Sequence, residues 1–185
     1  MFIQTEETPN PQSLKFLPDR KVMGEAEPLS FTNKELCANS PFAKQLLEIE
    51  GVAGVFLGSD FVTITKKPNA DWFALKPFIL NTLMKLFVND FPVVLDKLAG
   101  DSVTNDSDDP IVKQIKELLD TRIRPAVAGD GGDIVFDSFQ EGIVYLKLQG
   151  SCSGCPSSSA TLKTGIENML KYYVPEVTEV RQVGH

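Results

Sequence analysis

Residues 129–159 read GDGGDIVFDSFQEGIVYLKLQGSCSGCPSSS, and this stretch decides the fold of the second half of the chain. A glycine-rich turn leads into two β-rich runs, 133–139 and 142–149, which are joined by the turn Gln140-Glu141-Gly142. Apolar residues alternate in the second run, as they do in a strand with one buried face. The pattern predicts a β-hairpin followed by a loop, 150–158, that carries two cysteines.

Apolar residues recur at helical spacing on both sides of this hairpin. The first helix has Asp109 as its N-cap and Pro110 at its first helical position, and we expect it to end near Arg124-Pro125. The second helix covers residues 162–173, and a short strand over 177–183 closes the chain. The order α-β-β-α-β predicts a small α+β domain with both helices packed on one face of the sheet.

The first half of the chain predicts a second α+β unit. Its expected elements are a strand over 14–17, a helix over 41–49, a hairpin formed by 54–57 and 61–65, and a helix over 72–88. Between the halves lies AGDSVTNDSDD, residues 99–109, with four acidic residues and no basic one. Such a segment cannot pack into a core. We therefore predict two domains, 1–98 and 110–185, joined by a flexible acidic linker, 99–109.

The composition is that of an ordinary globular protein. The 185 residues are 42% hydrophobic with a mean hydropathy of -0.06. A net charge of -7 disfavours binding to nucleic acid or to anionic membranes. No window approaches the roughly 20 apolar residues that span a bilayer. The acidic N-terminus resembles neither a secretory signal nor an organelle presequence, so we expect a cytoplasmic protein or an imported one already trimmed.

Three cysteines are present, and two of them form the motif Cys152-Ser153-Gly154-Cys155. The spacing fits a redox dithiol, a zinc half-site or an iron-sulfur half-site, and does not by itself distinguish them. The single strand after the second helix leaves too little chain for a thioredoxin-like fold. A cluster or a thiolate zinc site usually takes four sulfurs, so a site made only of protein ligands requires two chains to meet.

Other candidate residues have simpler interpretations. Asp130 and Asp133 are expected to flank a tight turn, because so short a run lacks the ligands that calcium requires. Cys37 is expected to be a small buried or partly exposed thiol. His185, the single histidine, ends the chain, so we expect no nucleophilic pair and no enzymatic activity. Trp72 and the 12 phenylalanines are expected to lie mostly in the core.

Two sets of motifs resemble a known family. Arg124-Pro125, the run 129–133 and the loop 150–158, together with Thr161-Leu162-Lys163 and Gly165-Ile166-Glu167, closely resemble the NifU-like C-terminal domain. The first half resembles the Nfu N-terminal domain through the following motifs: Thr8-Pro9-Asn10-Pro11, Leu14-Lys15-Phe16, Ser40-Pro41, Gly51-Val52, Phe61-Val62-Thr63-Ile64 and Asp71-Trp72. The resemblance covers nearly the whole chain except the linker.

The resemblance implies an iron-sulfur cluster scaffold or carrier. In this family a [4Fe-4S] cluster is held between two subunits by paired Cys-x-x-Cys motifs and is passed to apo-proteins. Cys152 and Cys155 would be the cluster ligands, with Gly150, Gly154 and Pro156 shaping a surface loop. Transfer would proceed by exchange of thiolate ligands, without bond-making catalysis.

The partners implied are a second copy of the chain when cluster is bound, apo iron-sulfur client proteins and an upstream cluster assembly machinery. The expected location is the bacterial cytoplasm, or the mitochondrial matrix if a presequence has been removed. The alternative function is a thiol-disulfide oxidoreductase that uses the same Cys-x-x-Cys motif.

Overall fold

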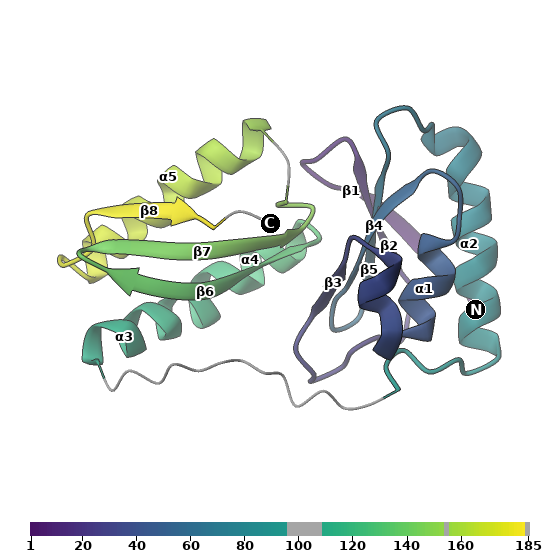
Figure 1. The fold of residues 1–185 in the computed structure, drawn as a ribbon, viewed down its shortest axis with the longest axis horizontal. Helices are drawn as coiled ribbons and strands as arrows, with labels where there is room; N and C mark the ends of the chain where they lie inside the picture. Colours follow the sequence, from purple (N-terminus) through teal and green to yellow (C-terminus); the bar gives the residue numbers. More distant parts are fainter. Residues whose placement is uncertain (96–108, 154–155, 184–185) are drawn as a thin grey trace. The chain divides into compact units, whose positions relative to one another are not determined.

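A computed structural model of the chain describes residues 1–95, 109–153 and 156–183. The chain divides into two compact units, Met1–Gly100 and Asp101–His185, each with its own sheet and hydrophobic core (Figure 1). The predicted linker, 99–109, lies outside the described residues except for Asp109. His185 also lies outside them. Within the described part of the chain, no helix is long and apolar enough to cross a bilayer.

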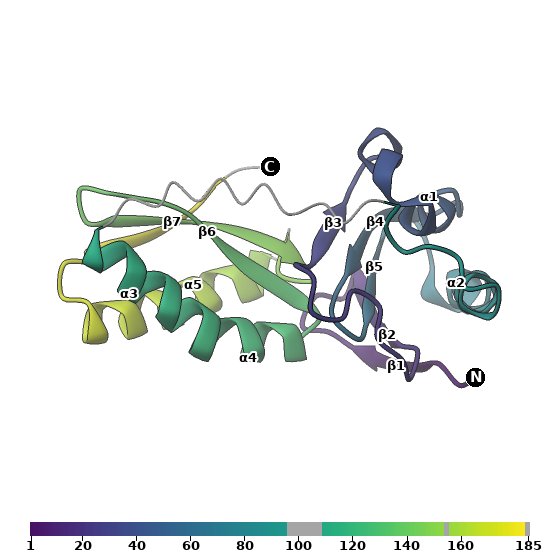
Figure 2. The ribbon, with the colours of Figure 1, turned by 90° about the horizontal axis from the view of Figure 1, so that it is seen from below.

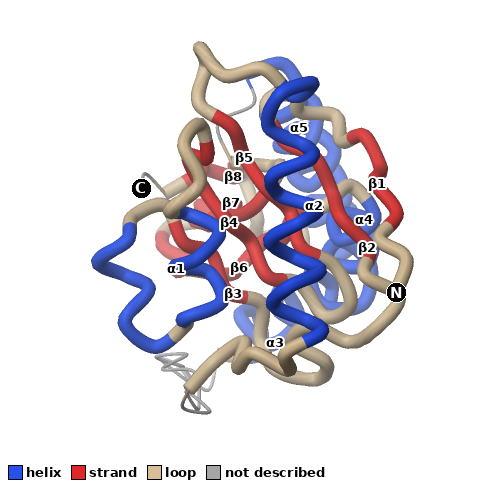
Figure 3. Tube along the Cα trace, turned by 90° about the vertical axis from the view of Figure 1, so that its right-hand side faces the viewer, coloured by secondary structure: helices blue, strands red, loops and turns tan. Residues whose placement is uncertain are grey.

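The first unit is built on a five-stranded antiparallel sheet with the strand order β1-β2-β5-β4-β3. The strands are β1 (Gln4–Glu7), β2 (Ser13–Leu17), β3 (Leu29–Phe31), β4 (Val52–Leu57) and β5 (Val62–Lys66). Two α-helices, α1 (Pro41–Leu47) and α2 (Trp72–Val88), cover one face of the sheet (Figures 2 and 3). A short 3₁₀ helix, Lys34–Asn39, precedes α1.

The helices of the first unit begin where capping residues predict. Ser40 accepts a hydrogen bond from the backbone N–H of Ala43, and Asp71 accepts one from that of Phe73. Between helices and sheet lie fully buried side chains: Phe16, Phe42, Leu46, Leu57, Ile64, Ile79 and Leu83. The predicted strand, hairpin and two helices are confirmed, whereas the edge strands β1 and β3 were not predicted.

The second unit has a three-stranded sheet with the order β6-β7-β8. Strands β6 (Gly132–Gln140) and β7 (Ile143–Gly150) form the predicted hairpin, and β8 (Glu179–Gln182) pairs parallel to β7. Helix α5 (Pro156–Tyr173) connects β7 to β8. Figure 2 shows the helices of this unit on one face of the sheet, so the predicted order and layering are confirmed.

The predicted end of the first helix of this unit, near Arg124-Pro125, is wrong. The helical path runs through α3 (Pro110–Leu118), a π-helical turn (Leu119–Ile123) and α4 (Arg124–Gly129). A proline in a regular helix clashes with the carbonyl four residues earlier, and the wider π turn before Pro125 relieves that clash. The path continues because the buried residues repeat every four positions, at Ile115, Leu119, Ile123 and Val127.

Helix α5 also differs from its predicted start. It begins at Pro156, six residues before the apolar pattern begins at Leu162. Ser157, Ser158 and Ser159 therefore lie inside the helix. The loop between β7 and α5 is correspondingly shorter than the sequence suggested, and the cysteine motif lies directly between a strand end and a helix start.

Candidate functional site at the end of strand β7

Cys152 lies two residues beyond the end of β7. Its side chain belongs to the hydrophobic core of the second unit and is only 7% exposed. The expectation of an open surface loop is therefore wrong for this cysteine in the single chain. Cys155 and Gly154 lie outside the described residues.

Gly132 makes the space that the Cys152 side chain occupies. A Cβ atom at position 132 would lie 2.6 Å from Sγ of Cys152 and 2.9 Å from the carbonyl oxygen of Gln149. Real Cβ atoms essentially never approach other atoms so closely. Gly132 pairs with Gly150 at the end of the hairpin, so two glycines face each other directly before the cysteine loop. Glycine at 132 is thus required by packing.

The glycine-rich turn before β6 is hydrogen-bonded to the cysteine loop. Ser151 donates from its backbone N–H to the carbonyl of Gly131 at 3.3 Å and from its hydroxyl to the carbonyl of Asp130 at 2.5 Å. Gly131 has a φ of 81° and Gly150 one of 63°, a region that favours glycine. The predicted tight turn is confirmed, and it positions the backbone on which Cys152 rests.

An ion pair fixes the start of β6. Arg124 donates from Nε and Nη2 to the two carboxylate oxygens of Asp133, each at 3.0 Å. The Asp133 side chain is 5% exposed, and Arg124 also reaches Asp120 at 3.1 Å. Because the pairing is bidentate, it holds α4 and β6 in a defined orientation next to Gly132. Asp133 is thus paired with Arg124 and anchors the start of β6.

Sequence reasoning singled out Arg124, Asp133 and the glycines as parts of motifs but did not find their roles. The signal for the ion pair was the presence of one arginine and one aspartate on either side of a turn. Only the fold shows that their side chains meet. The sequence did not indicate that position 132 needs glycine for packing against Cys152, because Gly132 is one of several glycines in residues 129–132.

Cys37 lies in the first unit, buried with 1% exposure, as predicted. Its Sγ donates to the carbonyl of Asn33 at 3.4 Å, and burial raises the pKa of the thiol while nearby Lys44 partly opposes that shift. A thiol that stays protonated is a poor metal ligand. In the described ranges 1–95, 109–153 and 156–183, no three histidine, cysteine or acidic side chains gather where they could hold a metal ion.

The chemistry of the site is therefore that of a soft half-site. Cys152 supplies one sulfur, and the sequence places a second cysteine three residues later, immediately before the first turn of α5. The helix N-terminus favours negative charge such as that of a thiolate. Two thiolates per chain suit soft metals and iron-sulfur clusters, and two such chains would supply the usual four.

The two halves of the chain match two known families. Residues 3–90 match the family described as "Scaffold protein Nfu/NifU N terminal", and residues 115–181 match the "NifU-like domain". A solution structure of a NifU-like protein from Saccharomyces cerevisiae is 31% identical. It covers 51% of this chain and 84% of its own, with a TM-score of 0.46.

Relatives match over the whole chain. The protein named "NFU1 iron-sulfur cluster scaffold homolog, mitochondrial" from Homo sapiens is 51% identical over 99% of this chain and 72% of its own length. The protein of the same name from Drosophila sechellia is 52% identical over 99% of this chain. The chain spans 65% of the length of the Drosophila relative. With both halves matched in order and half of all positions identical to these relatives, the chain belongs to the Nfu family.

Proposed function

We propose that this protein is an iron-sulfur cluster scaffold or carrier. A [4Fe-4S] cluster is held between two copies of the chain by Cys152 and Cys155 of each and is transferred to apo-proteins. The observation that carries the proposal is the placement of Cys152 over Gly132, in a loop that the turn 129–132 fixes just before α5. The names of the relatives, iron-sulfur cluster scaffold homologs, support the same function.

The dimer follows from the number of sulfurs. The chain has three cysteines, and Cys37 is buried in the core of the first unit with a raised pKa. Each chain thus contributes two thiolates at most from the motif, and four come from two chains. A cluster at such an interface is bridged by ligands that separate when the two chains separate.

Transfer proceeds by ligand exchange. In each step, one iron–sulfur bond forms to a client thiolate and one breaks to Cys152 or Cys155. The released cysteine sulfur takes up the proton that the client thiol gave up. Because Cys152 is 7% exposed in the single chain, loading a cluster includes movement of its sulfur away from Gly132. Burial of the empty thiol protects it from oxidation between transfers.

We further propose domain limits of 1–98 and 110–185 with 99–109 as a linker. The partners would be a second copy, apo-protein clients and an upstream assembly machinery that supplies the cluster. The names of the relatives favour the mitochondrion as the location, and none of these names supports a bacterial cytoplasm.

Anaerobic reconstitution with iron and sulfide tests the proposal. We expect a brown product with about four iron and four sulfide per two chains, and a mass in solution that shifts from monomer to dimer. Cys152→Ala or Cys155→Ala should abolish both loading and dimerisation, and Cys37→Ala should abolish neither. A colourless monomer whose Cys152 and Cys155 cycle reversibly to a disulfide would instead favour the thiol-disulfide oxidoreductase.

A further inference from the structure

The outward face of helix α2 is mostly apolar, with one polar residue, Asn81, at its centre. Five exposed residues follow each other at spacings of four, four, three and four: Phe73, Pro77, Asn81, Met84 and Val88. This spacing places them on one side of a helix, and we call them the outer stripe. Phe73 is 90% exposed and Val88 70% exposed. The stripe runs about 22 Å, four turns of helix.

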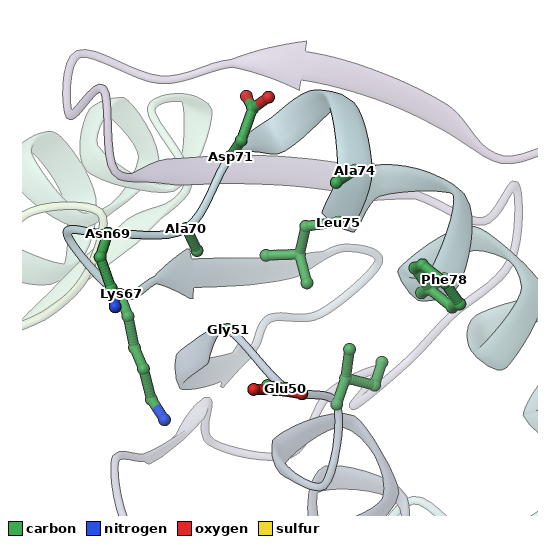
Figure 4. Close-up of a pocket in the computed structure, with 10 residues that line it drawn as sticks. Glu50, Gly51, Lys67, Asn69, Ala70, Asp71, Ala74, Leu75 and Phe78 are labelled. Carbon is green, nitrogen blue, oxygen red and sulfur yellow. The ribbon is translucent and has the colours of Figure 1, made fainter.

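The apolar surface continues from the outer stripe into a neighbouring groove. The groove has a volume of about 600 Å³ and is bordered by two loops and the first two turns of α2. Figure 4 shows Ala74, Leu75 and Phe78 of the helix on one side and Gly51 and Lys67 of the loops on the other. Phe78 is 65% exposed. Exposed apolar area of this kind marks a surface that binds a partner.

The charged residues of helix α2 itself, beside the outer stripe, have one sign. Residues 72–88 contain Lys76 and Lys85 and no acidic residue. At 100° per residue the two lysines lie on opposite sides of the stripe. Of the acids near the helix, Asp71 caps it through Phe73 and Asp90 pairs with Arg20 at 3.2 Å, whereas Glu50 lines the neighbouring groove. A partner with acidic residues on both sides of an apolar ridge would therefore match this face.

We propose that the outer stripe of α2 binds an amphipathic helix of another protein, whose apolar ridge is flanked by acidic residues. A second copy of this chain is a poor occupant. Pairing of two stripes in either direction would place the lysines of both copies, and no acidic residue of either helix, beside the interface. Anionic lipid is also a poor occupant, because Asn81 interrupts the stripe and the chain carries a net charge of -7.

Two designed peptides of about 18 residues test the proposal, since that length covers the stripe. Both have leucines along one helical face, and they differ only in having glutamates or lysines beside that face. Binding to the full chain is followed by the fluorescence of Trp72, the single tryptophan and the first residue of α2. We expect the glutamate peptide to bind about tenfold more tightly than the lysine peptide.

Two double variants and a control make the test specific. Lys76→Glu/Lys85→Glu should reverse the preference between the peptides. Phe73→Ser/Met84→Ser should weaken the binding of both peptides. Phe2→Ser, at another exposed aromatic position with 71% exposure, should leave the binding of both unchanged. The proposal is overturned if neither peptide binds, if charge reversal leaves the preference unchanged, if phosphatidylglycerol vesicles bind through Phe73 and Met84, or if the wild type is a dimer that Phe73→Ser/Met84→Ser dissociates.

Discussion

The space at Gly132 leads to a quantitative prediction for the variant Gly132→Ala. The added Cβ would lie 2.6 Å from Cys152 Sγ, 2.9 Å from the Gln149 carbonyl oxygen and 3.1 Å from the Cys152 backbone nitrogen. Two of these atoms belong to the backbone, so no side-chain rotation alone relieves the contact. Overpacking of this kind costs about 1–3 kcal/mol of unfolding free energy. The displaced atoms belong to the cysteine loop itself, so cluster loading should fall as well.

Gly165→Ala is the matched control. Gly165 lies in α5, and a Cβ there would meet no atom within 4 Å. Alanine in an exposed helix interior stabilises by about 0.5–1 kcal/mol relative to glycine. Urea denaturation followed by tyrosine absorbance reports on the second unit, because it contains all three tyrosines. If Gly132→Ala unfolds at the wild-type urea concentration and loads cluster normally, the packing argument for Gly132 is refuted.

Three further predictions concern buried or paired charges. Arg124→Met leaves the Asp133 carboxylate buried without its bidentate partner and should destabilise the second unit by about 3 kcal/mol, measured by the same denaturation. Burial raises the pKa of the Cys37 thiol in the folded chain. As pH rises, the thiol therefore ionises at a lower pH in the unfolded chain than in the folded one. The stability of the first unit should then fall as pH rises above about 8.5, and Cys37→Ala should flatten that decline in tryptophan-monitored denaturation. The hydrogen bond from Lys171 lowers the pKa of Glu167. The stabilisation of the fold by ionised Glu167 should therefore be lost as pH falls through that lowered pKa. Glu167→Gln should weaken this acid dependence in thermal melts.

The sequence predicted elements well where apolar periodicity and capping residues agree. Helix α2 was predicted over its observed range because Asp71 caps it and buried residues recur along it. Strand β1 was missed because Gln4–Glu7 has no alternation of apolar and polar residues. Its place in the sheet comes from backbone pairing with β2, which sequence pattern does not encode. Pro125 misled the prediction because a π turn accommodates it.

Exposure was less predictable than secondary structure. The phenylalanines were expected to be core residues, and Phe16 and Phe42 are fully buried, but Phe73 and Phe78 are exposed. All four lie in apolar stretches, and only the tertiary fold decides which helix face meets the sheet. For the candidate site, the sequence identified Cys152 by its motif. It did not predict that this cysteine is buried, because burial depends on the space left by Gly132.

The two described cysteines are both buried, and they should nevertheless differ in how they become reactive. Cys152 lies beyond the last strand pair, Gly132 with Gly150, in a loop whose hydrogen bonds include those from Ser151 to Gly131 and from Ser153 to Gly150. Cys37 is packed into the core of the first unit at 1% exposure. A local opening can therefore expose Cys152, whereas Cys37 requires unfolding of its unit.

Pulsed alkylation of the native chain, with peptide mapping by mass spectrometry, separates these two routes. We expect the rate at Cys152 to be nearly independent of urea below the unfolding transition, because local opening exposes little surface. The rate at Cys37 should rise steeply with urea, since it follows global unfolding of the first unit. Ligand exchange needs a thiol that can be reached without unfolding the domain that carries it. Equal urea dependence at both cysteines would mean that Cys152 is released only by unfolding, and a cluster carrier that works by exchange could not use it.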